Sequence, residues 1–214
     1  MLSLFGKINV EQAKYTTEEE YDKFSIRTYK PAVAVVTDCP ATVDDHGNKE
    51  SFQRLAKYIG VIGKPQNEAP DGSEEKISMT APVINTQEEN DLERVELTAP
   101  VMNRSAGDSH QMAFILPSSY TIDNAPKPTD LRVKLQEIPQ QRKAALSFSG
   151  TCSEDTAQEM AHKLLEGIRK ENIPLSESTE RKIGAGERFF EVARYNPPWT
   201  IPFLRTNEVL IPLD

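Results

Sequence analysis

The sequence predicts an α+β protein in which a duplicated antiparallel sheet curls into a barrel-like shape and two α-helices pack outside it. The order strand, strand, helix, strand, strand occurs twice along the chain. Placing Ile26 beside Val133 and Tyr58 beside Leu165 gives a repeat of about 107 residues, far longer than solenoid periods. Each half has one amphipathic helix, so neither half can cover its apolar face alone. We therefore expect one domain over 1–214, with pseudo-twofold halves at about 22–118 and 129–213.

The strands of the first half are marked by alternation and by proline. Residues 24–29 alternate between apolar and polar side chains, a break follows at 30–31, and an apolar run occupies 32–36. This pattern predicts a strand, a tight turn and a second strand. Further strands are expected at 76–83 and at 111–117, because apolar residues alternate in the first segment and proline closes the second.

The second half repeats this order of strands. Residues 131–135 and 143–148 predict a second strand pair around Pro139. Two more strands are expected at 188–195 and 207–212, so that each half contributes four strands to the sheet.

Each half also contains one helix with a single apolar face. Asn48 can cap the first helix, and Ser153 or Asp155 can cap the second. The buried stripe of the first helix would comprise Phe52, Leu55, Tyr58, Ile59 and Ile62. That of the second would comprise Met160, Leu164, Leu165 and Ile168.

A shorter duplication lies inside the first half. The motif KISMTAPV at 76–83 is echoed by RVELTAPV at 94–101. Pro82 and Pro100 each remove a backbone donor, so we expect these strands to end at a sheet edge or a bulge. Such an edge could accept a ligand or a partner.

Composition and charge exclude several classes of function. The chain has 214 residues and a formal net charge of −8, which disfavours nucleic acid and anionic lipid surfaces. No apolar run approaches the length of about 18 residues that a membrane span needs. We therefore expect a cytoplasmic protein. Cys39 and Cys152 are far apart and lack Cys-x-x-Cys spacing, so we expect two free thiols rather than a zinc site or a redox pair.

Several motifs occur together in one order along nearly the whole chain. They are KISMTAPV at 76–83, FILP at 114–117, ARYNPPWTIP at 193–202 and RTNEV at 205–209. In this combination the chain resembles the SOUL family of haem-binding proteins. The plant and algal cytosolic branch of that family is also similar at GKI (6–8), YKPAVA (29–34) and APKP (125–128). The resemblance implies a twisted barrel of about eight or nine strands with two helices, and reversible, non-catalytic binding of haem or other porphyrins as a carrier or buffer.

The iron ligand is the part of a haem site that sequence can test most directly, because only a few side chains ligate iron. His110 and His162 fall in a polar loop and on the polar side of a helix, and both are expected at the surface. His46, in the polar loop ahead of the first helix, is the best histidine candidate. Met79 is the second candidate, although a methionine at an inward strand position more often fills a core.

The proline-rich loop at 195–205 is the most informative loop of the chain. It holds Trp199 and Phe203 on a stiff connection, with Arg205 available to a carboxylate. Alternatively, the two aromatics close the end of the barrel. We expect the ring to lie between the first helix and this loop, with the following residues around it: His46, Lys49, Phe52, Leu55, Lys57, Met79, Trp199, Phe203 and Arg205.

Two other classes of function remain open. Glu191 and Tyr195 have the even spacing of one strand face and could form an acid–base pair of a small-molecule hydrolase related to effector-binding domains. However, the chain contains no Gly-x-Ser-x-Gly, no phosphate loop and no His-Glu-x-x-His. The third reading is an interaction module, which would use its strand edge to bind a protein partner or a second copy of the chain.

Overall fold

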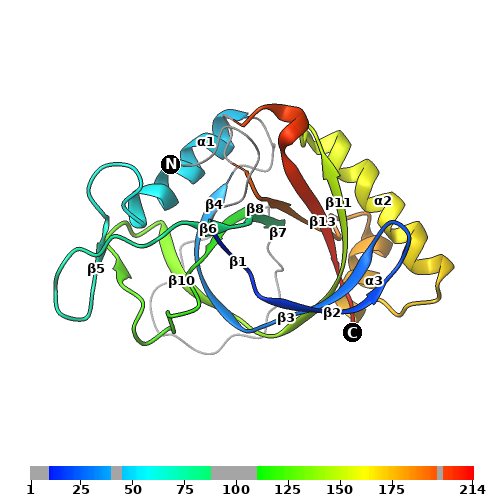
Figure 1. Ribbon diagram of the computed structural model, residues 1–214, viewed down its shortest axis with the longest axis horizontal. Helices are drawn as coiled ribbons and strands as arrows, with labels where there is room; N and C mark the ends of the chain where they lie inside the picture. The colour runs from blue at the N-terminus through cyan, green and yellow to red at the C-terminus, as the bar shows by residue number, and fades with distance from the viewer. Residues whose placement is uncertain (1–9, 40–44, 88–109, 197–199) are drawn as a thin grey trace.

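The computed structural model describes residues 10–39, 45–87, 110–196 and 200–214. Nine antiparallel strands form the main sheet, which curls so that its strands surround an interior. In order across the sheet they are β10 (Val133–Ile138), β4 (Ala32–Cys39), β8 (His110–Ile115), β7 (Val83–Gln87), β12 (Glu191–Arg194), β13 (Thr206–Pro212), β11 (Gln141–Ser149), β3 (Ser25–Tyr29) and β2 (Tyr15–Glu20). Helices α1 (Asp45–Tyr58) and α2 (Glu154–Lys170) lie outside the sheet (Figure 1). The predicted fold class is confirmed, with a third helix, α3 (Glu177–Ala185), that the sequence did not predict.

The order of the strands displays the duplication. From one end it reads β10, β4, β8, β7, and from the other, after the added edge strand β2, it reads β3, β11, β13, β12. Each half therefore donates its first strand to the other half, since β3 pairs with β11 and β10 pairs with β4. The tight turns expected at 30–31 and around Pro139 do not join neighbouring strands, and this part of the prediction was wrong.

Two prolines face each other at the point where the strands are exchanged. Tyr29 lies opposite Gln141, and Ala32 lies opposite Ile138. Two residues intervene on each chain segment, so Pro31 falls opposite Pro139. Neither proline has a backbone N–H, which interrupts the ladder at this point without reversing either chain. Both strand pairs consequently continue from one half of the barrel into the other.

Each of the two long helices covers its own apolar cluster on the outer side of the sheet. The α1 cluster comprises Leu55, Tyr58 and Ile59 with strand residues such as Val33, Val35, Met112, Phe114 and Val133. The α2 cluster comprises Leu164, Leu165 and Ile168 with strand residues such as Ile26, Ala144, Val192, Val209 and Ile211. The predicted stripes are confirmed for both helices except at Ile62, which lies beyond the end of α1 and is exposed.

The helix caps agree with expectation for α2 but not for α1. Ser153 caps α2 by accepting a hydrogen bond from the Thr156 amide, as predicted. By contrast, α1 begins at Asp45, so Asn48 lies inside the helix and is not its cap.

The motif at 76–83 also forms less strand than expected. Only β6 (Thr80–Ala81) is a strand before Pro82, and it pairs with β1 (Glu11–Gln12) outside the main sheet. After Pro82 the chain enters β7, a central strand between β8 and β12, so no open edge follows the motif. The echo of this motif at 94–101 lies outside the described residues.

The remaining elements are short. Strands β5 (Asn67–Glu68) and β9 (Lys127–Pro128) pair with each other, and the 3₁₀ helix η1 (Pro202–Leu204) precedes β13. Within the described part of the chain, no helix has the length and apolar character that a membrane span requires.

Candidate ligand-binding cavity

The inner side of the curled sheet encloses a cavity of about 950 Å³. On β8 strand alternation decides which residues reach it, because neighbouring side chains of a strand point to opposite faces. On β8, Gln111, Ala113 and Ile115 line the cavity, whereas Met112 and Phe114 pack beneath α1. Strand β1 contributes Glu11 and Gln12 to the same lining. The apolar part of the wall includes Ala32, Val36, Ile84, Ala113, Ile115, Ile138 and Leu210.

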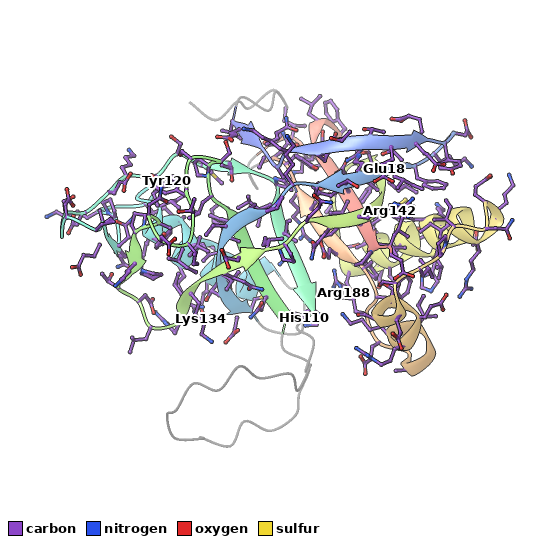
Figure 2. The ribbon with its side chains drawn as sticks, turned by 90° about the horizontal axis from the view of Figure 1, so that it is seen from below. Glu18, His110, Tyr120, Lys134, Arg142 and Arg188 are labelled. Atoms are coloured by element: carbon purple, nitrogen blue, oxygen red, sulfur yellow. The ribbon has the colours of Figure 1, made fainter. Side chains whose placement is uncertain are left out.

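The charged residues of the lining are mostly lysines, although the whole chain is acidic. The lysines are Lys14, Lys30, Lys134, Lys143 and Lys182, and the acidic residues are Glu11, Glu137 and Glu191. Figure 2 shows Lys134 far from the ion pair of Glu18 with Arg142, which joins β2 to β11. The lining thus has more lysines than glutamates within a chain whose net charge is −8. This distribution favours an anionic or carboxylate-bearing ligand over a cationic one.

One buried ion pair on the inner face is saturated with hydrogen bonds. Arg27 Nη1 lies 2.9 Å and 3.1 Å from the two carboxylate oxygens of Glu208. Ser147 donates a hydrogen bond of 2.7 Å to Glu208 Oε1, and Tyr195 donates one of 2.5 Å to Oε2. The guanidinium of Arg27 also lies 4.4 Å from the centre of the Tyr15 ring. Four donor contacts leave this carboxylate little capacity for a ligand.

The environment of Glu208 holds its neighbours in single protonation states. Burial and the negative charge of Glu208 both raise the pKa of Tyr195 and that of Tyr29 far above the ordinary value of a phenol. Burial acts to lower the pKa of Arg27, but the interactions with Glu208 and Tyr29 together outweigh it and raise the pKa. Tyr195 and Tyr29 therefore stay neutral, and Arg27 stays charged, at physiological pH.

A second ion pair on the same face is far less saturated. Lys143 Nζ lies 2.6 Å from Glu191 Oε2, and the two side chains are 6% and 15% exposed. Among the described residues this is the only hydrogen bond of the Lys143 ammonium, which also lies 5.8 Å from the centre of the Tyr29 ring. An ammonium has three donors, so Lys143 retains donor capacity within the cavity lining.

The site residues predicted from sequence fall into two groups. Phe52, Leu55 and Met79 come together in the α1 cluster, where Leu55 is fully buried and Phe52 contacts Phe114 at a ring distance of 5.3 Å. Lys49 and Lys57 are exposed on the same helix.

The other group lies on and around η1. Phe203 is 71% exposed, and Arg205 donates a hydrogen bond of 2.8 Å to the Thr200 carbonyl. η1 contacts β11, whereas α1 contacts β4, β8 and β10. Trp199 lies outside the described residues.

Of the two candidate iron ligands, Met79 is not among the described residues that line the cavity. His46 lies within α1 rather than in a loop before it, and its side chain is outside the described part. The loop prediction failed because the helix begins before Asn48. Met79 is half-buried against the α1 cluster. His162 is exposed on α2 as expected, but His110 is buried at the start of β8, opposite Cys39, rather than lying in a surface loop. In the described ranges no three His, Cys, Asp or Glu side chains cluster as a metal site would require.

The proposed acid–base pair is also rearranged. Tyr195 bonds to Glu208, and Glu191 bonds to Lys143, so Glu191 and Tyr195 do not pair with each other. The sequence reasoning missed Arg27, Lys143 and Glu208. The available signal was a charged residue at one position of an otherwise apolar strand, as in the segments KAAL (143–146) and EVLI (208–211).

Comparison with known proteins identifies the family. The model of the SOUL heme-binding protein family matches residues 10–212, so the chain belongs to this family. No curated protein sequence matches the chain.

Solved structures share the fold at very low sequence identity. The C-terminal domain of EcmrR has a TM-score of 0.52 and 9% identity, over 94% of this chain and 98% of that one. A hydrolase from Listeria innocua has a TM-score of 0.52 and 10% identity, over 92% and 94% of the two chains. An uncharacterized conserved protein from Listeria innocua has a TM-score of 0.55 and 12% identity, over 90% and 92%. These likenesses concern the fold alone.

Proposed function

We propose that the chain is a cytoplasmic, non-catalytic carrier or buffer that binds haem or another tetrapyrrole reversibly. The observation that carries this proposal is membership of the SOUL family over residues 10–212. The curled sheet supports it by offering a cavity of about 950 Å³, which lies within the usual range of ligand pockets, roughly 300–1,000 Å³.

Apart from iron ligation, a tetrapyrrole needs apolar contact and cations, and the cavity offers both. A macrocycle needs apolar contact, which Ile84, Ile115 and Leu210 provide from three different strands. Two propionates need cations, which the lysines of the lining provide. We therefore propose the cavity as the site of the ring.

The lining does not provide the usual iron ligands. Among the described cavity-lining residues, none is His, Cys or Met. The pKa values of the lining tyrosines, Tyr29 and Tyr120, are raised by burial and by a neighbouring glutamate, which disfavours the phenolate that iron would bind. Apolar contact with the ring and the attraction of its propionates to the lysines should therefore contribute most of the affinity. Metal-free protoporphyrin should consequently bind about as well as hemin.

The state of the carboxylates supports a role without catalysis. A general base needs a free lone pair within reach of its substrate. Glu208, the buried carboxylate beside Tyr195, has four donor contacts and therefore little capacity to act as a base. Turnover of esters or lactones by the purified protein would contradict this part of the proposal.

Titrating the protein with hemin and with metal-free protoporphyrin IX tests the proposal. We expect both to bind, with dissociation constants within about tenfold of each other, because neither requires an axial ligand. His46→Ala should change the hemin spectrum slightly at most. Failure of both ligands to bind would overturn the function, and tight binding of hemin alone would show that an axial ligand dominates.

Two variants locate the ring. Ala113→Phe places a large side chain in the cavity and should abolish binding. Phe203→Ala changes the exposed aromatic of η1 and should leave the affinity unchanged. If the ring lies instead between α1 and the proline-rich loop, Phe203→Ala should weaken binding about tenfold, since stacking and burial of an aromatic contribute comparable energies. In that case Ala113→Phe should have little effect.

A further inference from the structure

The inner face carries two buried ion pairs that differ in what they leave unsatisfied. Every oxygen of the Glu208 carboxylate already accepts two hydrogen bonds from protein donors. Lys143, in the second pair, has one such partner among the described residues, although its side chain is only 6% exposed. A buried ammonium with unused donors favours the arrival of an acceptor from the cavity.

Helix α3 also contributes to the lining of the cavity. Lys143 lies opposite Pro212 in the sheet, and the Thr179 hydroxyl donates a hydrogen bond of 3.0 Å to the Pro212 carbonyl. This contact joins the first turn of α3 to β13, the strand that pairs with β11 at Lys143. Ser176, Ser178 and Lys182 of this region line the cavity together with Lys143. Hydroxyl groups and a second cation thus belong to the same cavity lining as the buried ammonium.

We propose that Lys143 is the docking point for a carboxylate of the ligand, and that Glu191 occupies this point until the ligand arrives. The ligand class is an apolar body that carries at least one carboxylate. This inference rests on the proposed function for its physiological ligand, where the group would be a propionate of the tetrapyrrole. The same chemistry would also accept the carboxylate of a fatty acid.

The geometry predicts in which direction a change at Glu191 alters the affinity for a carboxylate ligand. Its carboxylate holds Lys143 at 2.6 Å, so an incoming carboxylate competes with it for the same ammonium. Removing the charge of Glu191 should therefore strengthen the binding of carboxylate ligands. Removing the charge of Lys143 should weaken it. A pair with a purely structural role would weaken binding in both variants, or in neither.

Three ligands distinguish the chemistry by direct titration. They are protoporphyrin IX, its dimethyl ester and a medium-chain fatty acid. We expect the ester to bind about 10- to 100-fold more weakly than the free acid, because a hydrogen bond to a charged group is lost. Equal affinity for the acid and the ester would overturn the inference, even if the porphyrin binds.

Four variants test the residues. Glu191→Gln should bind protoporphyrin IX more tightly than the wild type, and Lys143→Met should bind it about 10- to 100-fold more weakly. Because Lys143→Met leaves Glu191 buried without its partner, the double variant Lys143→Met/Glu191→Gln keeps the test valid if the single variant does not fold. Lys163→Met is the matched control, since Lys163 forms a 2.7 Å pair with Glu159 on the exposed face of α2.

The outcomes separate the inference from the proposed function. If the double variant binds the free acid as tightly as the wild type does, Lys143 is not the docking point. If the wild type binds the fatty acid through Lys143 but binds no porphyrin, the carboxylate site stands and the tetrapyrrole function fails. If the wild type binds porphyrin with no preference for the acid over the ester, the function stands and the inference fails.

Discussion

Tyr195 donates a hydrogen bond of 2.5 Å to the carboxylate of Glu208, from the residue after β12 to a residue of the neighbouring strand β13. Burial and the charge of Glu208 raise the pKa of Tyr195, and burial also raises the pKa of Tyr29 and Tyr58. A folded pKa above the unfolded value contributes stability below the unfolded pKa and loses it as pH rises. These tyrosines therefore make the folded state sensitive to alkaline pH.

We predict that the free energy of unfolding falls steeply above about pH 10, where the tyrosines of the unfolded chain ionise. Each buried tyrosine should contribute up to about 1.4 kcal/mol per pH unit in this range. Tyr195→Phe should reduce the slope, although it also removes one hydrogen bond. Urea unfolding at a series of pH values measures both effects. A slope that is the same in Tyr195→Phe would show that Tyr195 ionises normally in the folded protein.

A second prediction concerns the partner of Arg27. Glu208→Gln preserves the shape of the side chain but leaves a guanidinium that is 11% exposed without its counter-charge. We expect a loss of about 3–5 kcal/mol in the free energy of unfolding, as for other broken buried pairs. The exposed pair of Lys163 with Glu159 is the control, and Glu159→Gln should cost less than about 1 kcal/mol. Similar losses in the two variants would contradict the buried role of Glu208.

The third prediction tests whether the chain is one domain. Leu55 lies in the α1 cluster and Leu164 in the α2 cluster, and both are fully buried. Because each half donates a strand to the other, the two clusters should unfold together. Leu55→Ala and Leu164→Ala should each lower the free energy of unfolding by about 2–5 kcal/mol within a single transition. Near-UV and far-UV circular dichroism in urea should coincide, and two separate transitions in either variant would refute the single domain.

Sequence reasoning succeeded where a local pattern is sufficient. The stripe of Leu164, Leu165 and Ile168 and the cap at Ser153 depend on neighbours within α2, and all were predicted. The duplication could also be predicted from sequence, since the second half repeats the order of strand and helix patterns of the first half. The exchange of strands at Pro31 and Pro139 could not be predicted, because proline breaks a hydrogen-bond ladder whether the chain turns back or continues.

The candidate cavity could be predicted only in part. Strand alternation gives the face on which Glu191 and Tyr195 lie, but not the residue that each of them meets. Their partners, Lys143 and Glu208, come from two other strands, whose order depends on tertiary pairing. The expected site on α1 relied on Leu55, which the structure places in the core. Pattern alone does not distinguish an apolar residue that binds a ligand from one that fills a core.

The last prediction compares two glycines inside helices. Replacing a helical glycine with alanine usually stabilises a protein by up to about 1 kcal/mol, because alanine restricts the unfolded chain. At Gly184 of α3, an added Cβ would meet no atom within 4 Å, so Gly184→Ala should raise the free energy of unfolding by about 0.5–1 kcal/mol. At Gly167 of α2, the Cβ would lie 2.9 Å from the ring of Phe24, which is buried and stacked on Tyr21. Since this ring cannot retreat without disturbing the α2 cluster, Gly167→Ala should be neutral or destabilising, by up to about 3 kcal/mol. Thermal and urea unfolding of the two variants measure the difference, and an equal gain at both positions would show that Phe24 is free to move.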